Sequence, residues 1–520
     1  MRKKPTVLMI IDGYGIAPRE GNPVLKAKTP VLDRLKKEYP YVRCLSSGMA
    51  VGLPNGQAGN SETGYLNIGG GRIVYQELTR INGEIREGTF AENRVLLNAI
   101  DHSLRKDSNL HIFGLLSDGG VHSHIAHLFA LLDMVKRRGL EKVYIHCFLD
   151  GRDVFPGTGL EYVHTLQTRM RELGFGEIAS IHGRYYAMDR DGNYDRLKLT
   201  YAALTEGEGM KAANADDAVR MAYDRGETDE FILPTVIVNG GVPVGTIDDD
   251  DSVIFFNFRA DRARELTHAF CDDDYRFFKR SKKPDILFTC FSDYDPHIEN
   301  KMVAFEKTPL SNTFGEWISV NGLRQLKVAE SEKYAQMTYL LNGGTEELND
   351  QEDRLILKSP KVASYDQKPE MGAIELTDNL LKAIRSDRYD VIIMSLSNLD
   401  LTGHTAMEPA VIKAAETIDQ CIGRILPLIQ EKQGLLFICA DHGNAEKITD
   451  PVSGRSYTMH TNDPVPFMMI GYDRNYTLKE GGCLADIVPT IIETMEMEKP
   501  FEMTGKSLLK LRAGSGTEPS

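Results

Sequence analysis

Short apolar runs that end in an acidic residue place the strongest constraint on how this chain can fold. Residues 6–11 (TVLMII) are followed directly by Asp12, and residues 435–440 (LLFICA) are followed by Asp441. An unbroken apolar run of this length indicates a parallel strand that is buried on both faces. Because ligands of open α/β sheets bind outside the carboxyl ends of the strands, both aspartates are predicted at a functional edge.

Further strands alternate with helices along the chain. Strands are predicted at 109–116, 142–149, 177–182, 252–258, 285–291, 324–330, 391–396 and 465–470. Helices are predicted from Thr29, as the cap, and Pro30 onward, at 125–138, near 159–173, through Arg262 and Leu266, at 312–320, at about 408–431 and near 485–497. This alternation predicts an α/β fold built from mostly parallel sheets flanked by helices. At 520 residues, two or more domains are expected, with chain crossings near 75–80 and 307–312.

Composition excludes several classes of protein. The formal net charge of −14 at pH 7 argues against general nucleic-acid binding. No apolar run approaches the roughly 20 residues of a membrane span. The seven cysteines are scattered and contain no C-x-x-C pair, which favours a reducing cytoplasm over a structural zinc site. We expect a cytoplasmic monomer that acts on a small molecule, with a disordered tail at 513–520.

Side chains that bind metal ions gather at the predicted strand ends. They are Asp12, Asp400, His404, Asp441, His442 and His460. Taken singly, each is more often part of a turn or a hydrogen-bonded pair, so the repetition of acid and histidine carries the prediction. Mixed carboxylate and imidazole ligands suit Mn²⁺ or Zn²⁺, and a two-metal site suits phosphoryl transfer.

Ser61 lies in a run of small and polar residues, QAGNSETGYLNIGGGR (57–72). Small residues allow a tight turn, and a helix that starts here would attract an anion such as phosphate at its N-terminus. A neighbouring metal ion lowers the pKa of a hydroxyl group, which a serine nucleophile requires. Ser61 is therefore predicted to carry a phosphoryl group. The alternative is a polar loop in which Ser61 only caps the helix.

The middle of the chain supplies basic groups after successive strands. They are His122, His124, Arg152, Arg184, Arg190, Arg259 and Arg262. A single arginine is usually a solvated surface charge, but several at neighbouring strand ends predict a pocket for a small anion. Asp153 is a candidate general acid or base, and the alternative is an ion pair with Arg152 or another nearby arginine.

Motifs spread over nearly the whole chain, in collinear order, closely resemble those of the cofactor-independent phosphoglycerate mutases, which are alkaline-phosphatase-like metalloenzymes. The motifs are IDGYG, GNSETGYLNIGGGRIVYQ, LLSDGGVHSH, FLDGRDV, GRYYAMDRD, FFNFRADRAR, AESEKYA, SPKVASYDQKPEM, GHT, ADHGNAE and MHTNDPVPF. The resemblance implies interconversion of 3- and 2-phosphoglycerate in glycolysis and gluconeogenesis, through phosphoserine on Ser61 and without bisphosphoglycerate. It also implies a metal-binding phosphatase-like domain at 1–77 and 311–512, with an inserted phosphotransferase domain at 78–310.

The resemblance also implies roles for individual residues. One metal ion would be held by Asp400, His404 and His460, and the other by Asp12, Ser61, Asp441 and His442. The substrate would be bound by His122, Arg152, Asp153, Arg184, Arg190, Arg259, Arg262 and Lys333, with Ser61, Asp153 and Lys333 acting in catalysis. The two divalent ions are expected to be Mn²⁺, with Mg²⁺ or Co²⁺ as alternatives.

Three stretches depart from the usual pattern of that family. Tyr65 stands where the familiar motif has histidine, and Gln336 stands where many relatives have histidine. SLSNLDLTGH (395–404) replaces the common NYANPDMVGH. These departures leave room for a related phosphomutase or a metal-dependent phosphatase, which would not need the arginine set. They also leave room for a metal-binding paralogue that is not an enzyme.

Overall fold

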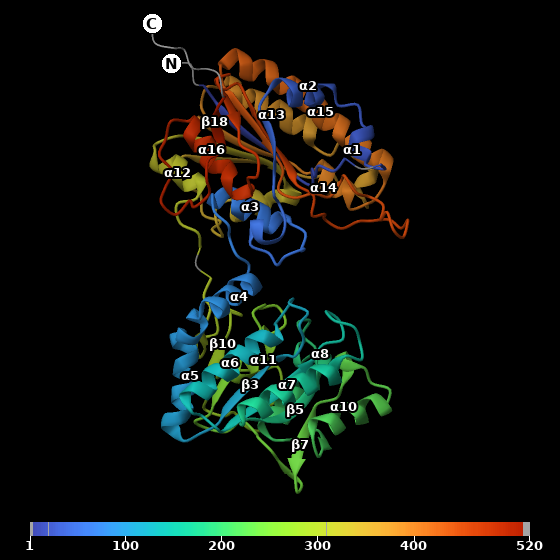
Figure 1. The fold of residues 1–520 in the computed structure, drawn as a ribbon, viewed down its shortest axis with the longest axis vertical. Helices are drawn as coiled ribbons and strands as arrows, with labels where there is room; N and C mark the ends of the chain where they lie inside the picture. Colours follow the sequence, from blue (N-terminus) through green and yellow to red (C-terminus); the bar gives the residue numbers. More distant parts are fainter. Residues whose placement is uncertain (1–3, 19, 308, 513–520) are drawn as a thin grey trace. The chain divides into compact units, whose positions relative to one another are not determined.

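The structure, a computed structural model, describes residues 4–18, 20–307 and 309–512, and its chain divides into two compact units (Figure 1). Unit 1 consists of Met1–Gln76 and Pro309–Ser520, and Unit 2 consists of Glu77–Thr308. Each unit contains its own helix-flanked sheet, so the predicted α/β fold class is confirmed. The predicted tail at 513–520 lies outside the described residues. Among the described residues, no helix is long and apolar enough to cross a membrane.

The main sheet of Unit 1 has seven strands in the order β13-β12-β14-β1-β15-β16-β2. Their bounds are β1 (Thr6–Ile11), β2 (Tyr41–Cys44), β12 (Gln325–Glu330), β13 (Glu352–Leu357), β14 (Val391–Leu396), β15 (Leu435–Cys439) and β16 (Val465–Ile470). The first five strands in this order run parallel, and β16 is antiparallel to both of its neighbours. A separate two-stranded sheet pairs β17 (Tyr476–Leu478) with β18 (Leu509–Leu511).

Helices cover both faces of this sheet (Figure 1). On one face, four helices pack against the long helix α15 (Glu408–Lys432): α1 (Pro23–Lys26), α2 (Pro30–Glu38), α13 (Ala373–Arg385) and α14 (Asn398–Gly403). On the other face, α12 (Phe314–Val320) and α16 (Ile487–Thr494) pack against α3 (Ser61–Gly70).

The start of α2 shows how a tertiary contact replaces a local one. Thr29 occupies the predicted cap position, but its side chain makes no capping hydrogen bond. Instead, the Asp419 carboxylate on α15 accepts hydrogen bonds from the backbone N–H groups of Val31 at 3.2 Å and Leu32 at 2.7 Å. The unsatisfied donors of the first turn are therefore paired by a distant residue, which also fixes α2 against α15.

The sheet of Unit 2 has the order β11-β10-β9-β3-β4-β5-β7-β6, and β8 pairs with β7. Its strands are β3 (Leu110–Leu115), β4 (Val143–Leu149), β5 (Glu177–Gly183), β6 (Met210–Ala212), β7 (Thr235–Asn239), β8 (Val242–Pro243), β9 (Ser252–Phe255), β10 (Leu287–Cys290) and β11 (Met302–Val303). Neighbouring strands are parallel from β11 to β5, and β7 is antiparallel to β5.

Alternate residues of these strands face two separate apolar layers. Ile112 and Ile145 belong to the layer beneath one set of helices, whereas Phe113 and Phe148 belong to the layer on the opposite face. The first set consists of α4 (Glu77–Glu87), α5 (Arg94–Lys106), α6 (Ile125–Arg138), α7 (Gly159–Leu173) and α10 (Ala215–Asp224). The second set consists of α8 (Arg184–Ala187), α9 (Tyr194–Thr205) and α11 (Arg264–Cys271). The two-residue period of a strand explains this division.

A row of buried polar side chains crosses the same sheet. His111 Nδ1 lies 2.9 Å from His146 Nε2, and His146 Nδ1 lies 2.7 Å from Ser180 Oγ. Ser180 Oγ lies 2.7 Å from His182 Nε2. Burial and the adjacent histidines lower the pKa of His146 well below its ordinary value, and burial lowers the pKa of His182 to about 3. Both rings are therefore neutral in the folded protein near neutral pH.

Acid should destabilise this part of Unit 2. Because the folded pKa values lie below the ordinary histidine value of about 6.5, the unfolded chain binds protons that the folded chain does not. Stability is therefore complete above about pH 6.5 and falls by up to about 1.4 kcal/mol per histidine for each pH unit below it. Hydrogen exchange of peptides from β4 and β5, corrected for intrinsic rates, measures this fall between pH 7 and pH 5.

Two variants serve as the comparison. Val242→Thr changes a side chain that is 67% exposed and has no titratable group, so the pH dependence of protection should not change. His182→Asn should reduce the number of protons taken up on unfolding by about one, and the slope of stability against pH should fall accordingly. Equal protection of β4 and β5 at pH 7 and pH 5 in the parent protein would contradict the neutral assignment.

Candidate active site

Five neighbouring strands of Unit 1 bring most of the predicted metal and phosphoryl-transfer residues to one sheet edge. Asp12 follows β1, Asp400 lies on α14 directly after β14, and Asp441 follows β15. Lys333 ends a short helical turn, Ser331–Lys333, that follows β12. His460 precedes β16, and because β16 is antiparallel to β15, its start lies at the same edge. The predicted helical spacing between Asp400 and His404 is present, with His404 at the C-terminal end of α14.

Two glycines allow the backbone to approach these side chains closely. Gly13 has a φ of +76°, and a Cβ atom there would lie 2.6 Å from Asp400 Cα. A Cβ atom at Gly64 in α3 would lie 2.7 Å from Asp441 Cβ. Any larger residue would therefore displace a carboxylate, in addition to the backbone strain at Gly13.

Ser61 is the first residue of α3 and does not cap it. The cap is Asn60, whose side chain accepts a hydrogen bond from Thr63 N at 2.9 Å. The alternative role of Ser61 as a helix cap is therefore wrong. Ser61 Oγ instead lies 3.0 Å from His442 Nε2 and accepts a hydrogen bond from Lys333 Nζ at 3.0 Å.

Asp400, His404 and His460 form one group that could hold a metal ion. The Nδ1 atoms of the two histidines donate to carbonyl oxygens, of Thr458 at 2.8 Å and of Gly59 at 2.9 Å. The Nε2 atoms therefore carry lone pairs, yet they lie 3.2 Å apart and 3.3 to 3.4 Å from Asp400 Oδ1. Three lone pairs that face one another are favourable only around a cation. A histidine whose other ring nitrogen donates to a backbone carbonyl group is also typical of a metal ligand.

Asp12, Asp441, His442 and Ser61 form a second group. Asp441 Oδ1 accepts hydrogen bonds from Gly13 N at 3.2 Å and His442 N at 2.9 Å. The Oδ2 atoms of Asp12 and Asp441 are buried, and Lys333 Nζ lies 3.0 Å from Asp12 Oδ2. His442 Nε2 lies 3.1 Å from Asp441 Oδ2. Buried carboxylate oxygens beside an imidazole and a hydroxyl are a donor set that fits a divalent ion.

Lys333 supplies positive charge to both groups. Its Nζ lies 2.7 Å from Asp400 Oδ2 and 3.0 Å from Asp12 Oδ2. Burial opposes this charge, but the two carboxylates raise the pKa of Lys333 above its ordinary value. Burial and the neighbouring Asp441 raise the pKa of Asp12 to about 7. Burial likewise opposes a charge on His442, yet Asp441 and Asp400 raise its pKa to about 9. The pocket therefore favours cations.

Asn444 and Glu446 belong to the site and were not identified from the sequence. Asn444 Nδ2 donates to Asp400 Oδ1 at 2.9 Å, and Asn444 N donates to Glu446 Oε2 at 2.9 Å. Thr461 Oγ1 donates to the other oxygen of Glu446. Both residues lie in the ADHGNAE motif after β15. Their closeness in sequence to Asp441 was the signal that could have identified them.

Unit 2 carries its basic residues at the ends of the adjacent strands β9, β3, β4 and β5. Arg184, the first residue of α8, donates from Nη1 to Asp150 Oδ1 at 2.6 Å and to Asp153 Oδ2 at 2.7 Å. The predicted alternative of an ion pair for Asp153 is thus observed, with Arg184 as the partner. Arg152 instead lies 3.5 Å from a carboxylate oxygen of Glu230.

A second carboxylate, Asp261, lies among the remaining basic groups. Its oxygens lie 2.8 Å from Arg190 Nη1, 3.0 Å from Arg259 Nε and 3.7 Å from His122 Nδ1. Arg262 donates to a backbone carbonyl group at 3.0 Å. Burial and a nearby arginine lower the pKa of His122 to about 4, so this ring is neutral near pH 7. The structure brings these groups together, and sequence analysis missed Asp150 and Asp261 as their partners.

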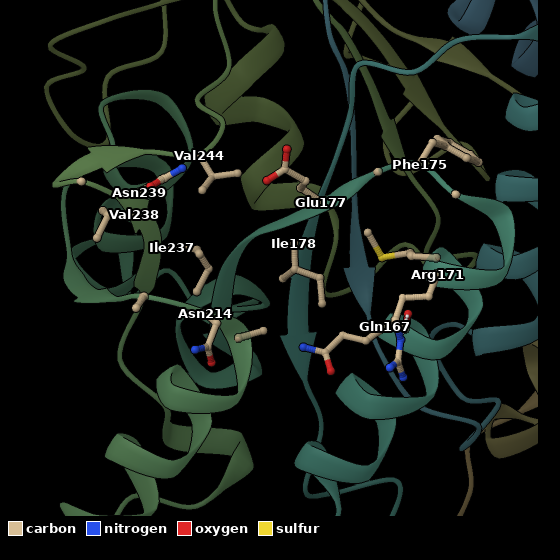
Figure 2. A pocket seen from close by; sticks show the side chains of 16 residues that line it. Gln167, Arg171, Phe175, Glu177, Ile178, Asn214, Ile237, Val238, Asn239 and Val244 are labelled. Carbon is tan, nitrogen blue, oxygen red and sulfur yellow. Dashed lines mark hydrogen bonds between the residues drawn. The ribbon is translucent and has the colours of Figure 1, made fainter.

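A hollow of about 890 Å³ in Unit 2 lies apart from these groups (Figure 2). Its lining includes Gln167, Glu177, Asn214 and Asn239, and none of the predicted site residues. It lies where β5 begins, whereas Arg184 follows the end of β5.

Two family models match successive parts of the chain. The model described as the BPG-independent PGAM N-terminus matches residues 81–296, and the model described as type I phosphodiesterase / nucleotide pyrophosphatase matches residues 310–500. The first match falls within Unit 2 and the second within Unit 1.

Full-length relatives carry one name, 2,3-bisphosphoglycerate-independent phosphoglycerate mutase. The relative from Lachnoclostridium phytofermentans is 56% identical and covers 98% of this chain and 99% of its own length. A relative from Clostridium perfringens is 52% identical and covers 98% of this chain and 100% of its own length. A crystal structure of the Leishmania mexicana phosphoglycerate mutase at low cobalt concentration covers 98% of each chain with 27% identity and a TM-score of 0.63. The chain therefore belongs to the family of 2,3-bisphosphoglycerate-independent phosphoglycerate mutases, as its motifs predicted.

Proposed function

We propose that this protein is an isomerase that interconverts 3-phosphoglycerate and 2-phosphoglycerate in glycolysis and gluconeogenesis. The phosphoryl group is carried on Ser61, and no bisphosphoglycerate takes part. One observation carries the proposal: Ser61 Oγ lies 3.0 Å from both Lys333 Nζ and His442 Nε2, and these two nitrogens also face the buried carboxylates of Asp12 and Asp441. A serine in this setting is suited to attack phosphorus and to hold the group it receives.

Family membership implies a dependence on divalent metal ions, and both donor groups of Unit 1 fit such ions. We assign one ion to Asp400, His404 and His460, and the other to Asp12, Ser61, Asp441 and His442. Mixed carboxylate and imidazole donors favour Mn²⁺, with Mg²⁺ and Co²⁺ as the alternatives. When bound, the ions would lower the pKa of the Ser61 hydroxyl and neutralise charge on the transferring phosphoryl group.

Ser61 Oγ forms a bond to phosphorus while the bond from phosphorus to the 3-oxygen of glycerate breaks. Lys333 offsets negative charge on the phosphoryl oxygens, and the N-terminus of α3 adds to this effect. In the first step Ser61 loses its hydroxyl proton and the departing 3-oxygen gains one. In the second step the 2-hydroxyl loses a proton as its oxygen attacks phosphoserine and Ser61 regains one, so no net proton is gained or lost; Asp153 relays the protons on the 2- and 3-oxygens.

The basic residues of Unit 2 hold the glycerate between the two steps. They are His122, Arg152, Arg184, Arg190, Arg259 and Arg262. Guanidinium groups bind carboxylate and phosphate oxygens in pairs, which keeps glycerate bound while it reorients. We accordingly assign Unit 1 as the metal-binding phosphatase-like domain and Unit 2 as the substrate-binding phosphotransferase domain.

We further propose that the protein works as a monomer in the cytoplasm. All seven cysteines carry free thiols, and six of them are buried, which is compatible with a reducing compartment. Both the monomeric state and the compartment remain predictions.

Replacing the nucleophile should abolish turnover. Ser61→Ala removes the attacking oxygen, so kcat for 2-phosphoglycerate formation should fall by at least about 1,000-fold. Ser453→Ala, at an exposed position, is the matched control and should keep full activity. An assay coupled to the consumption of 2-phosphoglycerate measures both. If Ser61→Ala retained parental activity, Ser61 would not be the phosphoryl carrier.

Removing a substrate-binding arginine should separate a mutase from a phosphatase. Arg184→Ala removes two charge-assisted hydrogen bonds and a predicted substrate contact, so kcat/KM should fall about 100-fold. Arg137→Ala, at an exposed position on α6, should leave kcat/KM unchanged. Free phosphate should stay a minor product in the parent protein, and phosphate as the main product from 3-phosphoglycerate would favour the phosphatase alternative.

Metal removal should inactivate the protein reversibly. Chelator-treated protein should lose the mutase activity, because Ser61 then lacks the charge that ionises its hydroxyl. Mn²⁺ should restore the activity, and metal analysis of the reloaded protein should give two ions per chain. Asp400→Asn should lower this number, whereas Asp273→Asn, with a side chain 78% exposed, should not. Full activity after complete chelation would refute the metal assignment.

A further inference from the structure

One oxygen of Asp12 receives hydrogen bonds from two buried hydroxyl groups. Tyr65 donates its phenol hydrogen to Asp12 Oδ1 at 2.7 Å, and Ser395 Oγ donates to the same oxygen at 3.2 Å. Tyr65 is 0% exposed on α3, and Ser395 is 2% exposed on β14. Three side chains from three separate parts of Unit 1 therefore form one polar cluster.

The other oxygen of Asp12 is left for a different partner. Asp12 Oδ2 is buried, receives no hydroxyl or backbone donor, and faces only the Lys333 ammonium group at 3.0 Å. Asp441 has the same asymmetry, since its Oδ1 receives two backbone N–H groups and its Oδ2 receives none. A carboxylate with one oxygen occupied in this way presents the other oxygen in a fixed direction.

The phenol is well placed to enforce that direction. Its ring is fully enclosed, so the hydroxyl cannot turn to water, and a buried phenol hydrogen needs an acceptor. Without this hydrogen bond, the Asp12 carboxylate would keep only the longer bond from Ser395. It could then rotate and offer both oxygens to an ion.

We propose that Tyr65 and Ser395 are a pair of positioning residues that hold Asp12 as a one-oxygen ligand of the divalent ion beside Ser61. The inference rests on the proposed function for that ion. It also explains together two of the departures from the family pattern, Tyr65 and the stretch 395–404. Tyr65 and Ser395 both donate a hydrogen bond to the same atom, Asp12 Oδ1.

The experiment is a calorimetric titration of the metal-free, full-length protein with Mn²⁺. Tyr65→Phe keeps the ring and removes only the hydroxyl group. One of the two Mn²⁺ sites should weaken about 10- to 100-fold, and the other should keep its affinity. At saturating Mn²⁺ the KM for 3-phosphoglycerate should match that of the parent protein, because substrate contacts are intact.

Two further variants sharpen the result. Ser395→Ala should weaken the same site by a smaller factor, because its hydrogen bond to Asp12 is longer. Tyr65→Phe combined with Ser395→Ala should differ from the product of the single effects, because both hydroxyl groups act on one oxygen. Tyr201→Phe is the matched control: this tyrosine of Unit 2 is 1% exposed and donates one hydrogen bond, to a backbone carbonyl at 2.9 Å. It should leave both Mn²⁺ affinities unchanged.

The outcomes separate this inference from the function on which it rests. Unchanged Mn²⁺ affinities in Tyr65→Phe would overturn it, including the case in which only the melting temperature of the metal-free protein falls. Equal weakening of both sites would also overturn it. A parent protein that binds no Mn²⁺ would contradict the proposed metal sites and this inference together.

Discussion

Three carboxylates, from Asp12, Asp400 and Asp441, are buried at one edge of a parallel sheet, with exposures of 0%, 3% and 0%. Burying an ionised carboxylate costs several kcal/mol unless it is paired with positive charge. Lys333 is shared between two of these carboxylates, and His442 lies beside the third. The need for further positive charge at this edge governs what the surrounding residues must be and what can bind there.

The surrounding structure holds the carboxylates in spite of that cost. β14, β1 and β15 are neighbours, so the residues that follow them converge. Gly13 and Gly64 leave room for the convergence, and Asn444 holds the outermost carboxylate. At each of Asp12 and Asp441, Oδ1 is held by hydroxyl or backbone donors while Oδ2 faces a basic side chain, Lys333 or His442. The resulting pocket of oriented lone pairs is an arrangement that divalent ions stabilise.

Much of the fold could be predicted because its signals are local. Apolar runs such as residues 6–11 are visible in any window of the sequence, and the acidic residues that follow them mark the functional edge. Edge strands were missed: β2 is four residues long, and most of β13 is only half-buried, so neither shows a continuous apolar run. The hydrogen-bond and ion-pair partners of individual side chains could not be predicted from the sequence. Asp419 caps a helix 387 positions away, and Asp261 pairs with Arg190 from another strand end, because only the folded chain determines these contacts.

The central claim is that Ser61 receives the phosphoryl group of phosphoglycerate in this cation-binding pocket. Acid quenching of the Mn²⁺-loaded protein within milliseconds of mixing with 3-phosphoglycerate, followed by peptide mass spectrometry, tests it most directly. The account predicts phosphate on the peptide that contains Ser61, at a level that depends on the metal ion. Normal turnover with no phosphate on Ser61, or with phosphate on a different residue, would contradict it.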